Sequence, residues 1–483
     1  MSTRKTVLLL VVVLFAVPAW SKVFVRWTQP VPPPAKRLGV HELAIPWTAD
    51  ALSLSQGAAR QGYRVYAEVA IGDASSAAKA AAKVGFAGII VNSGDSQPDQ
   101  IDQALRKLRS AYPRLLFLIL NPNGKQPQMR GTLIVKRNGV LEATSPTAQP
   151  WLDTNLALVR LERAFRPAQT PLYSFAWELT DTSQQQHGPD AQDYALAVAE
   201  AGAFDADLVL SLHESLENGM AQNNPSAWAV WDEVKPYLRF FAQHAERHLD
   251  PEANVGVVTD DDAASYEPIN LLARHNIALR VLRPADLSPR GLEGVDVVVV
   301  FSALDKLKAE TVTDFAKKGG VAVLVGSHGS LARQSDSGQS AQAVRLSEQS
   351  VSYAVGKGHV IELSEPVTDP ESFAQDIRRL IDHHKIRISL WNALTTVAVL
   401  YRPTGTPGRI VELLNYAEEP LQVQVQVKGS FRSIRFETPE QGCCESLKPT
   451  VRDGFTEFVV PSLNLTGRVY LQPESAAPQS SRR

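Results

Sequence analysis

The chain has 483 residues, of which 44% are hydrophobic, so it can bury several cores and is neither a disordered nor a fibrous chain. Its 49 basic and 51 acidic side chains leave a formal net charge of -2. This balance gives no support for nucleic acid or an anionic membrane as a partner, and it favours a small neutral or modestly charged ligand.

The first 21 residues have the pattern of an export signal. Arg4 and Lys5 precede an apolar run from Val7 to Trp20, and Ala19-Trp20-Ser21 forms a small-x-small cleavage site. The run is shorter than the ~20 apolar residues that span a bilayer, so we favour cleavage over an uncleaved anchor. The sequence therefore predicts an exported protein, periplasmic or extracellular, without a membrane contact after cleavage.

Residues 38–250 alternate short apolar runs with helical stretches, after a proline-rich segment, 22–37, that we expect to be an extended spacer. The runs are typical of buried parallel strands and comprise 62–70, 86–92, 114–120, 172–179 and 206–212. Two Ala-rich segments, 78–92 and 195–212, each contain a helix, a glycine expected to cap it and a strand. This repeat predicts a (β/α) barrel, incomplete or irregular because the region is shorter than the ~250 residues usual for that fold and shows no clear eighth strand.

Two more domains and one insertion are predicted. Within the barrel, 131–143 alternates around Asn138-Gly139 and indicates a β-hairpin. Residues 251–385 have the strand and helix pattern of a flavodoxin-like, doubly wound domain ending in a hairpin at 351–363. Residues 386–475 alternate with period two, which predicts an antiparallel β-sandwich, and 476–483 are expected to be a disordered tail.

The ends of the predicted strands supply the candidate site residues, because the working side chains of a (β/α) barrel lie at the carboxyl ends of its strands. This rule selects Glu68, Asn92, Asn121, Trp177, Glu178, His213 and Glu214. Glu178 and Glu214 follow successive predicted strands, so their carboxyl groups can approach the ~5 Å separation of a retaining glycosidase pair. We predict Glu178 and Glu214 as the catalytic pair and the other five as substrate-binding residues.

Each of these residues also has a plainer interpretation. Carboxylates at a barrel rim cap helices or pair with arginines, which stays an open alternative for every glutamate. His213 can orient a carboxylate or a sugar hydroxyl, or it can be an ordinary rim histidine. Trp177 offers a flat face to a sugar ring, but within a regular strand Trp177 and Glu178 cannot both face the barrel interior.

No metal or cofactor is expected from the sequence. The middle domain has neither a GK[ST] phosphate loop nor a glycine-flanked nucleophile, and His244 and His248 lack a third ligand. The two cysteines, Cys443 and Cys444, are adjacent and cannot cross-link distant segments. We expect two loop thiols, with a vicinal disulfide or a metal site as the alternatives.

The order of domains, the hairpin sequence VGKGHVIEL (355–363) and the strand sequence LLNY (413–416) resemble family-42-type β-galactosidases. The resemblance implies a middle domain that is amidotransferase-like and inactive and serves trimerisation, hence a homo-oligomer. It also implies an Asn-Glu pair after the fourth barrel strand. Here we take 114–120 as that strand: Asn121 follows it but no glutamate does, and moving the acid/base role to Glu178 is our own inference.

Two functional hypotheses follow. The first is an exported glycoside hydrolase-like protein that cleaves a glycosidic bond with Glu214 as nucleophile and Glu178 as acid/base. The second is a non-catalytic carbohydrate-binding or assembly protein on a glycosidase scaffold that has lost one carboxylate. Both imply a carbohydrate as the ligand.

Overall fold

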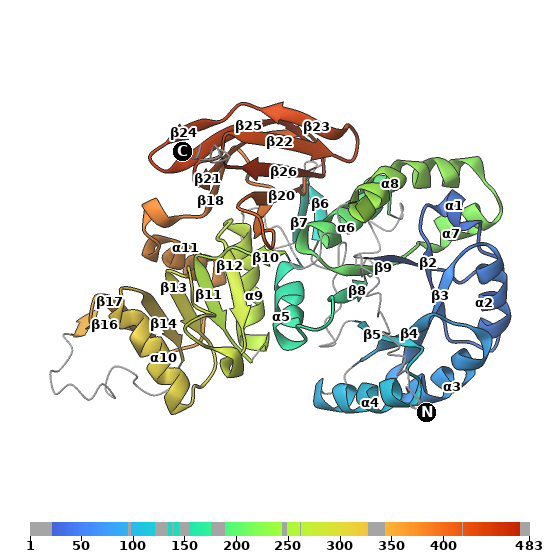
Figure 1. Ribbon diagram of the computed structural model, residues 1–483, viewed down its shortest axis with the longest axis horizontal. Helices are drawn as coiled ribbons and strands as arrows, with labels where there is room; N and C mark the ends of the chain where they lie inside the picture. The colour runs from blue at the N-terminus through green and yellow to red at the C-terminus, as the bar shows by residue number, and fades with distance from the viewer. Residues whose placement is uncertain are drawn as a thin grey trace, which may run out of the picture.

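The computed structural model describes residues 22–94, 98–120, 134–137, 140–143, 155–174, 189–243, 249–260, 262–326, 343–417 and 419–473. These residues form a barrel-like domain, a doubly wound α/β domain and a C-terminal β-sandwich, as predicted, and Figure 1 shows the sandwich lying against both of the other domains. Among the described residues, every helix is too short or too polar to cross a membrane.

The first domain is built on a seven-stranded parallel sheet with the order β5-β4-β3-β2-β1-β9-β8. Its strands are β1 (Val23–Arg26), β2 (Glu42–Pro46), β3 (Arg64–Ala70), β4 (Gly88–Asn92), β5 (Leu116–Leu120), β8 (Leu172–Ser174) and β9 (Asp207–Ser211). The edge strands β5 and β8 contact each other, so the sheet curls into a nearly closed barrel. This confirms the expectation of an irregular (β/α) barrel.

The strand β1 corrects the prediction for the N-terminal region. Residues 22–37 were expected to be a spacer, but Val23–Arg26 pair in parallel with both β2 and β9 at the centre of the sheet. The spacer pattern comes from the prolines between Pro30 and Pro34, which connect β1 to the short helix α1 (Ala35–Leu38). A four-residue strand beside a proline run is too short to stand out as an apolar pattern.

Helices cover the outside of the barrel sheet in Figure 1. They are α2 (Ala51–Arg60), α3 (Ala74–Val84), α4 (Pro98–Ala111), α5 (Leu156–Phe165), α6 (Ala191–Phe204), α7 (Glu214–Ala221) and α8 (Pro225–Gln243). Gly85 caps α3 with φ 83°, as predicted. Gly202 does not cap α6, which continues to Phe204 and is capped by Asp205. A β-carbon at Gly202 would lie 2.7 Å from the Phe241 ring of α8, so this glycine serves helix packing.

The second domain has the strand order β12-β11-β13-β14-β17-β16-β15, in which the first five strands are parallel. Numbered along the chain, this is the 2-1-3-4-5 order of flavodoxin-like folds, so the predicted topology is confirmed. The strands are β11 (Val255–Val258), β12 (Leu279–Leu282), β13 (Val297–Val300), β14 (Val321–Val325), β15 (Ala343–Arg345), β16 (Ser350–Val355) and β17 (Gly358–Leu363), with helices α9 (Asp262–Arg274), α10 (Lys306–Lys317) and α11 (Pro370–Leu380).

The third domain consists of two antiparallel sheets, β10-β19-β20-β26-β22-β23 and β18-β21-β25-β24. Their strands are β10 (Asp250–Pro251), β18 (Ile388–Trp391), β19 (Thr396–Arg402), β20 (Arg409–Asn415), β21 (Leu421–Lys428), β22 (Ser433–Thr438), β23 (Gly442–Leu447), β24 (Thr450–Arg452), β25 (Phe455–Leu463) and β26 (Thr466–Gln472). The predicted hairpin is also present, as β6 (Ile134–Arg137) and β7 (Val140–Ala143).

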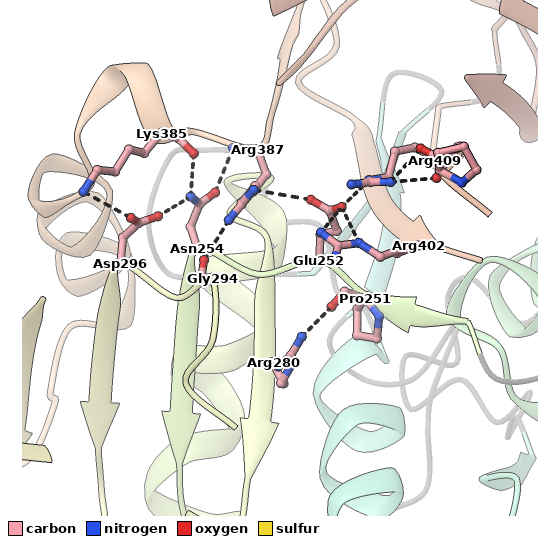
Figure 2. Close-up of polar contacts among 12 residues, drawn as sticks. Pro251, Glu252, Asn254, Arg280, Gly294, Asp296, Lys385, Arg387, Arg402 and Arg409 are labelled. Carbon is pink, nitrogen blue, oxygen red and sulfur yellow. Dashed lines mark hydrogen bonds and ion pairs between the residues drawn. The ribbon is translucent and has the colours of Figure 1, made fainter. Parts of the chain in front are cut away.

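Buried polar contacts join the three domains. The hydroxyl of Tyr401 on β19 donates to the carbonyl of Ala203 on α6 and accepts from Arg160 on α5. Figure 2 shows the segment that leaves the barrel, where Glu252 lies among Arg387, Arg402 and Arg409. Asn254 next to it donates to Asp296 and to the carbonyl of Lys385. Residues 252–254, at the start of the second domain, therefore lie in an interface with other parts of the chain.

Candidate functional site

Side chains inside the barrel lie in layers that follow from strand alternation and register. Phe24, Ala44, Tyr66, Ile90, Leu120, Leu172 and Val209 form one separate buried cluster. Phe24 and Tyr66 meet edge to face with their ring centroids 4.9 Å apart. A β-carbon at Gly88 would clash with the Tyr66 ring and the Leu116 carbonyl oxygen, which explains a glycine at the start of β4. The barrel is thus packed at its middle.

Two residues further along β1, β3, β4 and β9, the same face carries polar groups. Arg26 ends β1, Glu68 lies near the end of β3 and Asn92 ends β4, each in the same alternation phase as the buried cluster. Ser211 ends β9 directly opposite Arg26 in the register. We call Arg26, Glu68, Asn92 and Ser211 the mouth layer, because they are at the carboxyl ends of parallel strands, where active sites of barrels lie.

Glu68 is not an isolated carboxylate in the mouth layer. The Arg26 Nε donates to Glu68 Oε2 at 2.7 Å, and the side chains are 34% and 15% exposed respectively. This arginine partner was missed by sequence reasoning, because β1 was assigned to a spacer. A carboxylate paired in this way is suited to binding or orientation, since the arginine neutralises its charge.

His213 and Glu214 follow β9 and open helix α7. His213 is the N-cap residue, and its Nδ1 accepts from the backbone N–H of Ser215 at 3.4 Å. The backbone N–H of His213 donates to the Tyr194 hydroxyl at 2.9 Å. Glu214 is the first helical residue, exposed, with the Asn218 amide 3.5 Å away. His213 therefore caps the helix, and Glu214 adds an acidic side chain to its first turn, where such a side chain is favourable.

A second carboxylate of α7, Glu217, was not singled out from the sequence. It is 4% exposed and accepts from both the backbone N–H and the hydroxyl of Thr28, which follows β1. The position is one helical turn from Glu214, so the i, i+3 spacing of the two glutamates on a helix after a barrel strand could have drawn attention to it. Its two hydrogen bonds give it the role of holding the chain after β1 against α7.

Three predicted site residues, Asn121, Trp177 and Glu178, lie outside the described residues. The separation of the Glu178 and Glu214 carboxyl groups therefore stays a prediction. The strands that precede them are described: β8 and β9 are parallel neighbours, with Ser174 opposite Val209. Segments that follow neighbouring parallel strands emerge at the same end of the sheet.

The strand count changes the position expected for the Asn-Glu pair. Because β1 comes first, the fourth strand along the chain is β4, which ends at Asn92, and not the strand before Asn121. The residue after Asn92 is Ser93, which is buried and donates to the Leu120 carbonyl at 3.4 Å. The asparagine of the expected pair is present at this position and the glutamate is not.

Solved glycosidase structures share the fold along almost the whole chain. The α-L-fucosidase isoenzyme 2 from Paenibacillus thiaminolyticus has a TM-score of 0.60 and 12% identity, over 94% of this chain and 100% of that one. Gan42B, a GH42 β-galactosidase from G. stearothermophilus, has a TM-score of 0.58 and 8% identity, over 94% of this chain and 98% of that one. The β-galactosidase from Rahnella sp. R3 has a TM-score of 0.53 and 11% identity, over 93% of this chain and 99% of that one.

These likenesses confirm the architecture expected from the resemblance to family-42-type β-galactosidases, and at such low identity they establish the fold alone. Neither a protein-family model nor a curated protein matches the sequence. The chemistry of the site therefore depends on the residues in the barrel mouth.

Proposed function

We propose that the protein is an exported glycoside hydrolase-like protein that cleaves a glycosidic bond at the mouth of its barrel. The observation that carries this proposal is the mouth layer, in which Arg26, Glu68, Asn92 and Ser211 lie at one end of the sheet. The carbohydrate ligand is supported by the glycosidases that share the fold.

Glu178 and Glu214 are the proposed catalytic carboxylates. Support comes from β8 and β9 being neighbours, since each glutamate follows one of these strands within a few residues. In this proposal Glu178 protonates the leaving oxygen and Glu214 attacks the anomeric carbon, with a carboxyl separation of about 5 to 5.5 Å for a retaining reaction. Glu68 and Asn92 then bind sugar hydroxyls, and the hydrogen bond from Arg26 holds the Glu68 carboxylate in place.

The alternative is a carbohydrate-binding protein without hydrolytic activity. Two observations favour it: Ser93 stands where the resemblance implies a catalytic glutamate, and Glu68 is neutralised by Arg26. Hydrogen-bonding groups in the mouth layer suit a bound sugar in either case.

A panel of aryl glycosides, assayed with the full chain and with Glu178→Gln and Glu214→Gln, distinguishes the two functions. We expect activity on at least one glycoside, with each substitution lowering kcat by about 100-fold or more, the order of effect for a lost general acid or nucleophile. Activity that survives both substitutions would remove this catalytic pair. Sugar binding by calorimetry without turnover of any glycoside would establish the binding function instead.

Export is part of the proposal, and one contact of Lys22 supports cleavage after Ser21. The backbone nitrogen of Lys22 lies 2.7 Å from the Asp207 Oδ1, and Asp207 is 6% exposed. Cleavage after Ser21 would turn this nitrogen into an ammonium group paired with a buried carboxylate. We expect mass spectrometry of the secreted chain to find Lys22 as the first residue, whereas a chain that begins at Met1 in a membrane fraction would favour the anchor.

A further inference from the structure

The two cysteines lie where the β-sandwich meets the barrel. Cys443 and Cys444 are on β23 and form a disulfide with each other, so the expectation of two loop thiols is wrong. Cys443 and Glu437 line a pocket of about 250 Å³ whose other wall comes from α8, including Arg239 and Phe240. Cys443 is exposed, so a solute that enters this pocket can reach the sulfurs.

Glu437 on the neighbouring strand β22 points at this pair. It is 6% exposed, its Oε1 lies 2.8 Å from the Cys444 Sγ, and its Oε2 accepts from the Tyr470 hydroxyl at 3.3 Å. A disulfide sulfur carries no proton, whereas a thiol donates a weak hydrogen bond. The carboxylate is therefore better matched to the reduced pair than to the disulfide.

The three side chains lie close enough together to hold one ion once the disulfide is reduced. A carboxylate oxygen of Glu437 and the two sulfurs all lie within 4.8 Å of one another. Around a tetrahedral ion with metal–sulfur bonds of about 2.3 Å, two thiolates are roughly 3.8 Å apart, within that range. Two thiolates and a carboxylate prefer a soft or borderline divalent ion such as Zn²⁺ or Cd²⁺ over Mg²⁺ or Ca²⁺.

We infer that reduction of the Cys443–Cys444 disulfide creates a site for a soft divalent cation. An external dithiol supplies two electrons and two protons: the sulfur–sulfur bond breaks, two thiols form, and the dithiol becomes a disulfide. Binding of the cation then releases both thiol protons to solvent. With Glu437 as third ligand, the fourth position stays open toward the pocket for water or a small ligand.

The sandwich hairpin that carries this site is also fastened to the barrel. The Tyr237 hydroxyl of α8 donates to Glu440, in the turn between β22 and β23. A cation held by Glu437 of β22 and the two cysteines of β23 would bridge the two strands beside this contact, which the disulfide between neighbouring residues of β23 does not do.

The test uses Cd²⁺ alone and the full chain, reduced with a dithiol and freed of reductant under nitrogen. The chain has only two cysteines, so any thiolate-to-cadmium charge-transfer band must come from this pair. We expect one equivalent of Cd²⁺ per reduced chain, no band with the oxidised chain, and no band with Cys443→Ser. Glu437→Gln should weaken binding about tenfold or more, while Glu440→Gln is the matched control and should leave it unchanged.

Several outcomes would overturn this site. The reduced chain could show no charge-transfer band, or Glu437→Gln could bind Cd²⁺ as tightly as the unmodified chain. Half an equivalent of Cd²⁺, with a doubling of mass in sedimentation, would assign the band to cysteines of two copies. Thermal unfolding of each variant without metal provides the check on folding, and added Cd²⁺ should raise the midpoint of the reduced chain alone.

Discussion

Glu252 shows how one buried side chain can hold the segment after the barrel against the β-sandwich. Its carboxylate accepts from Arg402 at 3.0 Å, contacts Arg409, and lies 3.7 Å from Arg387, while only 7% of the side chain is exposed (Figure 2). Burial lowers the pKa of Arg409, and the carboxylate opposes that shift. Removing the single acid leaves several half-buried cations without compensation.

We therefore expect Glu252→Gln to lower the free energy of unfolding by about 3 to 5 kcal/mol, the range for breaking a buried ion pair from one side. Arg402→Gln is the control: this arginine is 56% exposed, and its loss should cost less than about 1 kcal/mol. Urea unfolding followed by circular dichroism measures both. Equal losses in the two variants would contradict the role of burial.

Glu162 on α5 predicts a specific pH dependence. Burial raises the pKa of Glu162 from 4.5 to about 7, although Arg166 lies 2.8 Å away and opposes the shift. A carboxyl whose pKa is higher in the folded state stabilises the protein fully below pH 4.5, and this contribution is lost as the pH rises through 7.

We expect the chain to lose up to about 3 kcal/mol of stability between pH 5 and pH 8 through this one group, at 1.36 kcal/mol per pKa unit. Because other groups titrate as well, the informative quantity is the difference in the free energy of unfolding between the unmodified chain and Glu162→Gln. The variant lacks the contribution of Glu162 across the same pH interval. Denaturant unfolding of both chains at several pH values gives that difference. A difference independent of pH would show that Arg166 keeps Glu162 ionised throughout.

At the scale of elements, helix α7 contains two glutamates with opposite surroundings. Glu217 is buried and accepts two hydrogen bonds from Thr28, whereas Glu214 is exposed. Glu217→Ala should cost about 2 to 4 kcal/mol, because two donors after β1 lose their acceptor. Glu214→Gln should change stability by less than about 0.5 kcal/mol, as surface substitutions do.

Thermal unfolding of both variants checks this contrast. It also serves as the folding control for the glycosidase assay of Glu214→Gln. If Glu214→Gln destabilises the fold as much as Glu217→Ala, a loss of glycosidase activity in that variant would say nothing about a nucleophile.

At the scale of the molecule, one hydrophobic cluster reaches into all three domains, beside separate clusters inside the barrel, the second domain and the sandwich. A single cluster contains Trp231 of the barrel, Val255 of the second domain and Tyr401 of the sandwich. Because this core is continuous, we expect one cooperative unfolding transition, with tryptophan fluorescence and far-ultraviolet circular dichroism giving the same midpoint. Two resolved transitions would mean that the polar contacts in Figure 2 hold domains that are otherwise independent.

The second domain is proposed to serve assembly, as the resemblance implies. Sedimentation velocity of the full chain should then give a multiple of the 52.7 kDa chain mass. A monomer at all accessible concentrations would remove this oligomeric role.

Much of the fold could be predicted from the chain itself. Buried parallel strands are apolar throughout, so β4, β9 and β13 stand out as runs such as Gly88–Asn92, and sandwich strands show period two because one face meets solvent. The rule that barrel sites lie at strand ends selected Glu68, Asn92, His213 and Glu214 from these runs alone. Local sequence determines such features because burial of each strand depends on its own pattern of side chains.

The tertiary structure decided what depends on partners far away in the chain. Strand β1 is four residues long, and its place at the centre of the sheet comes from pairing with Glu42–Pro46 and Asp207–Ser211. That placement brings Arg26 into contact with Glu68 and Thr28 into contact with Glu217. It also makes the strand that ends at Asn92 the fourth along the chain. Pairings between residues 42 to 189 positions apart leave no periodic signal in the sequence, because they arise only when the sheet closes.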